Sequence, residues 1–298
     1  MNKFLKTLLV IGITFTVIGG VVFVAAASAA GWDFSAASAT QSVEKSHTAT
    51  APVTDIKIDY ENASVEIRPA PSGSELTVLY PQLQNKKGEN VAEITVKEEA
   101  GALTVTEKIN WAHGFSLWNF QQPKLVLSLP TDRSYALQIT TNNGAIVFAE
   151  GAFQLTSLHL DTDNGAIQTE RATLSVSGAV ELSTDNGAIR LGKTAAASLY
   201  AETDNGEIRF DENVTADSVR AETNAGAIVA NGCLQANDIT LDSDVGSITA
   251  LVYGTRADYT ITVSTDVGSS NLTSSTGGAK TLTVTTDVGS INVRFSGE

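Results

Sequence analysis

The side chains best suited to chemistry in this 298-residue chain are carboxylates at one point of a repeated motif. The motif reads Thr or Ser, then Asx, then any residue, then Gly. Its second position is Asp in six copies: Asp163, Asp185, Asp204, Asp244, Asp266 and Asp287. Stacked copies would place these carboxylates roughly 5 Å apart, and Ca²⁺ prefers such oxygen ligands. Alternatively, each Asx caps its own turn by bonding backbone N–H groups. Turn geometry explains every copy, so we expect no metal or other cofactor.

Groups that could serve catalysis are dispersed along the sequence. The three histidines, His47, His113 and His159, are far apart, and the single cysteine, Cys233, has no histidine beside it. The sequence contains no nucleophile elbow, paired metal-binding histidines or phosphate loop. We therefore expect a protein that is not an enzyme, with His159 on an outward strand position and Cys233 as a small buried strand residue.

The charge balance excludes one class of partner. The formal net charge is −14, and no basic stripe is present. Arg190 and Arg209 occupy equivalent positions of adjacent motif copies, which is typical of a solvated face. Because phosphate backbones are bound by clustered Lys and Arg, nucleic acid is not an expected partner.

Self-similarity predicts the elements that position these residues. Glycine closes the motif at Gly144, Gly165, Gly187, Gly206, Gly226, Gly246, Gly268 and Gly289, in steps of 19 to 22 residues. Apolar residues alternate on both sides of each glycine, which indicates strand, turn, strand. One unit cannot bury its own apolar face, so the units are expected to stack. The predicted fold is an all-β, single-stranded β-solenoid, right-handed and β-helix-like, with coils of about 20 residues; a meander of antiparallel hairpins is the alternative.

The third motif position changes along the chain. Asn occupies it at Asn143, Asn164, Asn186 and Asn205, whereas Val occupies it at Val245, Val267 and Val288. Asn-Gly favours turns in which both residues have positive φ, and β-branched Val disfavours positive φ. The later turns are therefore expected to differ in backbone type, with only glycine in the positive-φ region.

The solenoid domain is predicted to span residues 54–298, and its first part is less regular. Residues 54–108 look like degenerate versions of the same unit. Residues 108–123 break the rhythm with an aromatic insertion that contains Trp111, Phe115, Trp118 and Phe120. Exposed aromatic clusters mark interaction sites, so these four residues are interaction candidates. The alternative is an insertion that covers an open end or side of the solenoid.

The N-terminal segment predicts export. Lys3 and Lys6 precede an uncharged run over residues 7–32, long enough to cross a bilayer as a helix with the N-terminus in the cytoplasm. Residues 1–31 are thus a predicted membrane anchor, and the Ala/Ser/Thr-rich residues 32–53 a linker. Ala27-Ser28-Ala29 also fits a signal-peptide cleavage site, which would give a secreted protein. Both alternatives place the solenoid outside the cytoplasm.

Several short motifs, in order, resemble a known family. They are the Lys-flanked span, Gly31-Trp32-Asp33-Phe34, the insertion from Trp111 to Phe120, Pro123-Lys124-Leu125, and the glycine-turn repeats. Together they resemble the bacterial "putative adhesin" family with repeated β-strands, domain of unknown function 4097. The resemblance implies a cell-surface β-solenoid typical of Gram-positive bacteria. Family turns are often Ser-Ser-Gly-Asp, and this chain has Asp-Asn-Gly-Ala, so turn side-chain chemistry does not carry over.

Two functions are consistent with these expectations. The first is a membrane-tethered surface interaction module, adhesin-like, that binds a cell-wall polymer, a glycan or a surface protein. The second is an accessory component of envelope-stress sensing that works through a membrane partner. The chain ends at Glu298 directly after a strand, with no helix to cap the coil. An open terminal strand could also pair with another copy, which predicts possible homo-oligomers.

Overall fold

The protein is described by a computed structural model over residues 39–61, 63–85, 88–90, 92–109 and 124–298. The chain divides into two compact units. The smaller comprises Met1–Val43, Leu83–Ala92 and Asn110–Phe120; in its described part Gln84 and Asn90 form an antiparallel bridge. The larger comprises Glu44–Gln82, Glu93–Ile109 and Gln121–Glu298, and we call it the solenoid unit.

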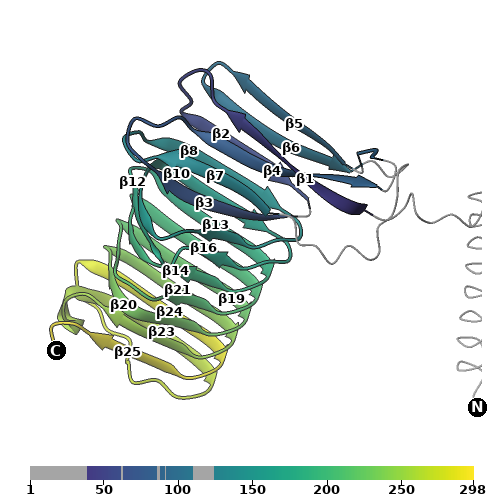
Figure 1. The fold of residues 1–298 in the computed structure, drawn as a ribbon. Helices are drawn as coiled ribbons and strands as arrows, with labels where there is room; N and C mark the ends of the chain where they lie inside the picture. The colour runs from purple at the N-terminus through teal and green to yellow at the C-terminus, as the bar shows by residue number, and fades with distance from the viewer. Residues whose placement is uncertain (1–38, 62, 86–87, 91, 110–123) are drawn as a thin grey trace, which may run out of the picture. The chain divides into compact units, whose positions relative to one another are not determined.

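One sheet of the solenoid unit, sheet A, gathers the strands that precede the repeat turns (Figure 1). All its described pairs are parallel. In spatial order its strands are β6 (Ala102–Ile109), β2 (Asp55–Tyr60), β8 (Tyr135–Thr141), the second half of β10 (Gly151–Thr162), β13 (Ala179–Asn186), β16 (Ser198–Asn205), β19 (Ser218–Ala225), β21 (Asp238–Val245), β24 (Lys280–Val288) and β23 (Tyr259–Val267).

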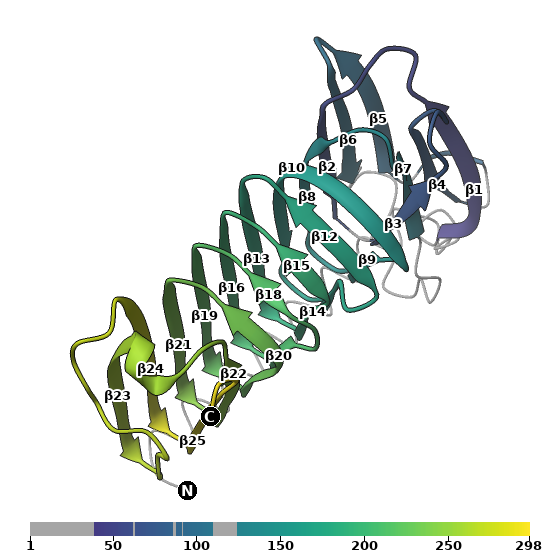
Figure 2. The same cartoon turned by 90° about the vertical axis from the view of Figure 1, so that its left-hand side faces the viewer.

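Two further sheets complete each coil (Figure 2). Sheet B contains β4 (Thr77–Asn85), β7 (Lys124–Pro130), β3 (Ser64–Ala70), β9 (Ile146–Phe148), β11 (Ile167–Gln168), β14 (Ile189–Leu191), β17 (Ile208–Phe210), and the first parts of β20 (Ile228–Gln235), β22 (Ile248–Val252) and β25 (Ile291–Phe295). Sheet C contains the first half of β10, β12 (Ala172–Val176), β15 (Lys193–Ala195), β18 (Val214–Thr215) and the last parts of β20, β22 and β25.

The core is a set of apolar ladders between these sheets. Alternate residues of each strand point inward, as in β8, where Tyr135, Leu137 and Ile139 are buried. One ladder of sheet A consists of Ile58, Ile139, Leu160, Leu182, Ala201, Ala221, Leu241, Val284 and Val263. The parallel register confirms the predicted β-solenoid, and the alternative of antiparallel hairpins is wrong for the repeats.

The turn glycines are required for a reason other than the one predicted. Among the described residues, positive φ occurs at Ala100 and at six glycines, Gly73, Gly88, Gly101, Gly151, Gly254 and Gly277, none of which closes a repeat turn. A Cβ on Gly206 would instead lie 1.9 Å from the carbonyl oxygen of Gly187 in the preceding coil. The prediction that the Asn-Gly and Val-Gly turns differ through positive φ is therefore wrong. Glycine is present because successive turns stack backbone on backbone.

The first residue of the motif fills the buried side of the same turn. Thr203 is buried, and its Oγ1 donates a hydrogen bond of 2.9 Å to the carbonyl oxygen of Gly187. The bond recurs in every coil as Thr141 to Ala63, Thr162 to Gly144, Thr184 to Gly165, Thr223 to Gly206, Ser243 to Gly226, Thr286 to Gly246 and Thr265 to Gly289. This hydroxyl–glycine ladder explains why Thr or Ser stands three residues before each glycine.

The solenoid does not follow chain order at either end. Strand β24 lies between β21 and β23. The outermost strand of sheet A at this end is therefore β23, although β24 follows it in sequence. Strand β2 likewise lies between β6 and β8. At the C-terminal end, Ser275 bridges Ile261 of β23, and a short 3-10 turn, η3 (Arg256–Asp258), precedes β23. The coil is therefore partly covered there, contrary to the prediction of an open end.

The predicted degenerate units over residues 54–108 are only partly correct. Strands β2 and β3 form one coil. Strands β5 (Ala92–Glu99) and β6 are instead joined by Ala100 and Gly101, both at positive φ, which is typical of a hairpin turn. Strand β4 runs through Pro81 and pairs antiparallel with β7.

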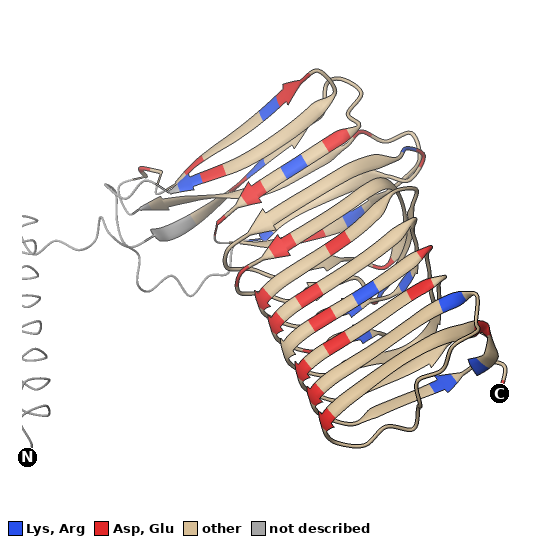
Figure 3. Ribbon diagram, turned by 180° about the vertical axis from the view of Figure 1, so that it is seen from behind, with Lys and Arg blue, Asp and Glu red and all other residues tan. Residues whose placement is uncertain are grey.

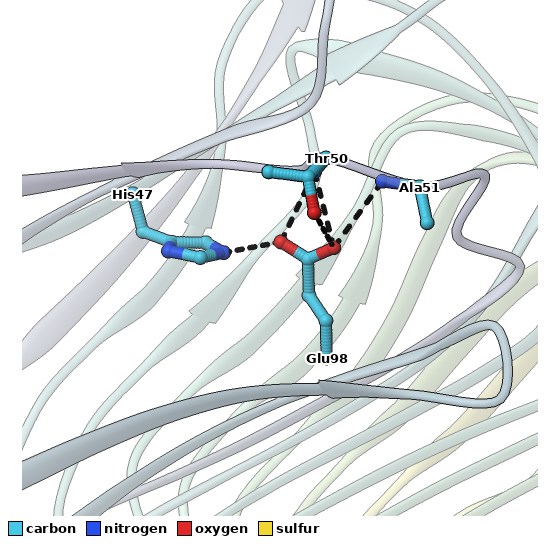
Figure 4. A network of polar contacts seen from close by, with 4 residues as sticks. All are labelled: His47, Thr50, Ala51 and Glu98. Atoms are coloured by element: carbon cyan, nitrogen blue, oxygen red, sulfur yellow. Dashed lines mark hydrogen bonds and ion pairs between the residues drawn. The ribbon is translucent and has the colours of Figure 1, made fainter.

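The N-terminal prediction needs one correction. Strand β1 (Ala39–Thr48) lies inside the predicted linker 32–53. Its described side chains are mostly exposed, so its sequence lacks the alternation of apolar residues that would have predicted a strand. Its end is held by Glu98, whose carboxylate accepts hydrogen bonds from His47 Nε2 at 2.5 Å and from the backbone of Thr50 at 3.1 Å and Ala51 at 3.3 Å (Figure 4). Burial raises the pKa of Glu98, but these bonds outweigh it and the pKa is lowered.

The membrane prediction concerns residues that the structure leaves undescribed. The predicted span, residues 1–31, lies outside the described ranges. Within those ranges, no helix has the length and apolar character needed to cross a membrane.

Candidate functional site

The outward face of sheet A carries one polar side chain per coil along a single line, which we call the outward row. It consists of Lys57, Gln138, His159, Glu181, Tyr200 and Arg220. Each member lies between two buried core residues of its strand, so alternation turns it to solvent. Because the coils stack in parallel, neighbouring members are roughly 4.8 Å apart.

Contacts along the axis connect the row. His159 Nδ1 lies 3.1 Å from Glu181 Oε2 in the next coil. The Tyr200 hydroxyl lies 2.7 Å from Glu202 Oε2 and 2.9 Å from Glu222 Oε2. Arg220 pairs with Glu222 and sits with its guanidinium carbon 6.0 Å from the Tyr200 ring centroid. Burial, followed by these two carboxylates, raises the pKa of Tyr200, so the phenol stays protonated and can donate.

A second line of outward residues runs beside the row and is acidic. It contains Asp59, Thr140, Asp161, Ser183, Glu202, Glu222 and Asp242. Burial raises the pKa of Asp161, and the charges of Asp163 and Asp185 raise it further, while His159 opposes them. The face therefore offers many hydrogen-bond acceptors and an unfavourable potential for anions.

A hollow lies at the N-terminal end of the row. Its volume is about 350 Å³, and residues from β6, β2, β8 and β10 line it, among them Lys57, Gln138, Ser157 and His159. The pairing of β10 with β8 shifts register between Leu155 and Ser157, at the hollow's rim. Such bulges re-aim side chains and are over-represented beside binding sites. The hollow thus combines apolar and polar walls at one end of a polar row.

The predicted calcium ladder is a row of exposed single carboxylates. Asp163, Asp185, Asp204, Asp244, Asp287 and Asp266 follow one another along the edge between sheets A and B, seen as a red line in Figure 3. A coil contributes at most one of them, and Asn224 interrupts the row between Asp204 and Asp244. In the described part of the chain, no three His, Cys, Asp or Glu side chains converge in a group that could hold a metal ion. Backbone N–H groups of these turns bond backbone carbonyls of neighbouring coils instead, as Gly206 N does to Ala225 O at 3.1 Å and Gly246 N to Val288 O at 3.0 Å, which differs from the predicted Asx capping.

The residue after each Asx forms a different exposed line, which changes character halfway. In the first part, amides bond to one another: Asn164 Nδ2 to Asn143 Oδ1, Asn186 to Asn164, and Asn205 to Asn186, each at 3.2 Å. In the last coils, exposed valines replace them: Val245 at 55%, Val288 at 45% and Val267 at 63% exposure. Strand pairing places Val288 between the other two.

Other predicted site residues have mixed outcomes. The interaction candidates Trp111, Phe115, Trp118 and Phe120 lie outside the described residues. Arg190 and Arg209 are register partners, as predicted, and Arg209 forms a two-bond pair with Glu207.

Cys233 is partly exposed, contrary to the buried position predicted for it. It sits at a register irregularity of β20, where alternation fails as a guide. Partial burial raises the pKa of its thiol.

The outward row was missed in the sequence although a signal was present. Five of its six members stand six residues before a repeat glycine, from Gln138 before Gly144 to Arg220 before Gly226, and Lys57 stands six residues before Ala63. The residue type differs at every copy, so a search for recurring types finds the turns and overlooks the row. His159 was predicted to face outward and does.

Comparison with known proteins agrees with this architecture. The family described as Toastrack DUF4097 matches residues 53–294. A solved protein described as a "putative adhesin" from Parabacteroides merdae has a TM-score of 0.54 at 14% identity, over 87% of this chain and 97% of that one. One so described from Bacteroides fragilis has a TM-score of 0.50 at 16% identity, over 86% and 98%. No curated protein matches.

These likenesses, all far below 25% identity, concern the fold, and the family match rests on the sequence from the first coil to the last. The predicted resemblance is thereby confirmed. The chain belongs to the Toastrack DUF4097 family.

Proposed function

We propose that this protein is a non-enzymatic surface interaction module that binds a linear, hydroxyl-rich cell-wall polymer or glycan along the outward row. The observation that carries this proposal is the row itself. Six coils present six side chains of differing hydrogen-bonding type at a constant step. A polymer laid along the solenoid axis would meet a donor or acceptor at each step.

The chemistry of the row supports a neutral or cationic polymer. Tyr200 donates, Glu181 of the row and Glu202 of the acidic line accept, and Gln138 does both. The acidic line beside the row and the net charge of −14 disfavour a polyanion. The hollow could seat the end or a branch of such a polymer.

The arrangement favours binding over catalysis. Covalent catalysis needs a nucleophile bonded to a base that a third group orients. The contacts of the row are His–carboxylate, Tyr–carboxylate and Arg–carboxylate pairs that run along the surface. They fix the side chains in place for a ligand. The neighbours described as "putative adhesin" are consistent with such a role.

The location in the cell is part of the proposal. The predicted span at residues 1–31 would tether the solenoid to the cell membrane, with the N-terminus cytoplasmic and the coils outside. A protease-protection assay on intact cells, read with an epitope at each terminus, tests this arrangement. Loss of the C-terminal epitope with survival of an N-terminal one is expected.

Binding is tested by co-sedimentation of the full-length protein, in detergent micelles, with purified insoluble cell wall. The wild type is expected to sediment, and H159A/Y200A/R220A to remain in solution. The matched control is T240A/T283A/T262A, which changes the continuation of the same line over β21, β24 and β23. Equal sedimentation of all three proteins, or of none, would refute the proposal.

A second candidate is favoured by the Glu98 contacts. Within the solenoid unit, Glu98 binds His47, Thr50 and Ala51, which lie near the residue at which this unit begins in the sequence. An ordered start of the solenoid unit on the side of the predicted span suits an accessory component of envelope-stress sensing that acts through a membrane partner. Crosslinking in living cells separates the candidates, because capture of a membrane kinase supports the second and capture of wall polymer supports the first.

A further inference from the structure

The last three turns expose an apolar line in a place where earlier turns are closed by their own side chains. Val245, Val288 and Val267 are adjacent, and between 45% and 63% of each is exposed. We call them the valine line. In the Asn turns, each amide is bonded to the next, so their line needs no partner. Valine has no polar side-chain group with which to bond its neighbours. Contiguous exposed apolar residues mark interaction sites.

Charge decides what can cover the valine line. The residue before each valine is an exposed aspartate: Asp244, Asp287 and Asp266. A covering segment would therefore bury apolar groups directly beside three carboxylates. An acidic or neutral partner would leave these charges facing one another, whereas lysine or arginine would pair with them. A second copy of this chain would bring the same aspartates and is disfavoured for the same reason.

The step of the line decides the shape of the partner. The valines repeat about every 4.8 Å along the axis. Apolar residues one helical turn apart repeat about every 5.4 Å, so across three coils the mismatch is only about 1 Å. Alternate residues of an extended strand repeat about every 6.6 Å, so they fall out of step with the valines after one coil. A helix laid along the axis fits, with apolar residues at i, i+3 or i+4, and i+7.

We infer that the valine line and its aspartates dock a cationic amphipathic helix of a partner protein. The apolar stripe of the helix packs on Val245, Val288 and Val267. Lysine or arginine on its flank faces the aspartates. Three valines form a small surface, so the contact is weak and transient, and it weakens as salt screens the charges.

The test uses full-length protein in nonionic detergent and a synthetic Leu/Lys helical peptide that carries a photoreactive group. Crosslinks are expected within residues 243–247, 265–269 and 286–290, and their yield should fall with added salt. The variant V245N/V288N/V267N should lower the yield roughly tenfold. Asn occupies the same position in four earlier coils, so this variant is expected to fold.

Two further arms make the test decisive. The variant N164V/N186V/N205V copies the valine line into earlier coils and should gain crosslinks there, beside Asp163, Asp185 and Asp204. A peptide of the same composition with scrambled leucines should give only background. Three outcomes would overturn the inference: yields unchanged by V245N/V288N/V267N, crosslinks spread over other faces, or protein–protein crosslinks of the chain with itself through residues 243–247, 265–269 and 286–290.

Discussion

The four turns that carry Asn143, Asn164, Asn186 and Asn205 and the three that carry Val245, Val288 and Val267 are alike inside and different outside. On the buried side, both groups have a hydroxyl bonded to a backbone carbonyl of the neighbouring coil, which is a glycine carbonyl in every turn except that of Asn143. On the exposed side, one group is closed by an amide ladder and the other is apolar. The comparison separates residues that build the coil from residues that are free to acquire a function.

The buried side leaves almost no freedom because three constraints meet there. The turn backbones approach so closely that only hydrogen fits on the glycine. The hydroxyl then satisfies the glycine carbonyl, which would otherwise be buried without a partner. The exposed residue between them contacts mainly solvent, so its side chain can change from amide to valine without altering the stack.

Replacing a turn glycine should have the largest effect and should not distinguish the two groups. In G206A the new Cβ would lie 1.9 Å from Gly187 O, and in G246A 1.7 Å from Gly226 O. Backbone lies on both sides of each clash, so the coils must separate. We expect losses of about 3 kcal/mol or more in unfolding free energy for both variants. Thermal or denaturant unfolding measures this, with S247A as an exposed control; wild-type stability in either glycine variant would contradict the stacking.

Removing the hydroxyl should be the next largest effect, again in both groups. T203V leaves Gly187 O without its 2.9 Å bond, and S243A does the same to Gly226 O. An unsatisfied buried acceptor costs about 1–3 kcal/mol. Valine has nearly the shape of threonine, so T203V isolates the hydrogen bond. The companion T203S retains the hydroxyl and should recover most of the difference in denaturant midpoint.

These residues show what the sequence could reveal and what it could not. The glycine period and the alternating apolar residues predicted the solenoid and its parallel stacking correctly, because core ladders require that pattern. The reason for the glycine was mistaken, since Asn-Gly in isolation signals positive φ, and a close approach between coils cannot be read from one turn. The order of β24 and β23 was not predictable either, because their motifs are equivalent and nothing local distinguishes an inserted coil from an outer one.

The candidate site was less predictable than the fold. The row from Lys57 to Arg220 has no recurring residue type and becomes a row only when coils are in register. The aspartates recur and therefore suggested a calcium ladder, yet a coil carries at most one of them, on an exposed edge. Repetition identifies what every coil needs, and a binding surface differs from coil to coil.

Breaking the exposed ladder should cost less than breaking the buried one, and only in the Asn group. N186A removes the amide that donates to Asn164 and accepts from Asn205, both at 3.2 Å. Exposed hydrogen bonds contribute at the low end of the usual range, so we expect a loss of about 0.5–1 kcal/mol. V288A, its counterpart in the other group, should be close to neutral. Equal losses in the two variants, measured by chemical denaturation, would remove the distinction between the groups.

Neutralising the aspartates should have the smallest effect, and it should be a gain. Like charges opposite one another on neighbouring strands destabilise a sheet, so D244N/D287N/D266N should raise stability by a few tenths of a kcal/mol at low salt. Salt should shrink the difference because these carboxylates are exposed. Calcium would act differently: a bound ion needs six to eight oxygen ligands, whereas each coil offers at most one of these carboxylates. The Tm of the wild type is therefore expected to be the same with calcium and with a chelator. A Tm that falls on chelation in the wild type, but not in D244N/D287N/D266N, would instead establish a calcium ladder along this edge.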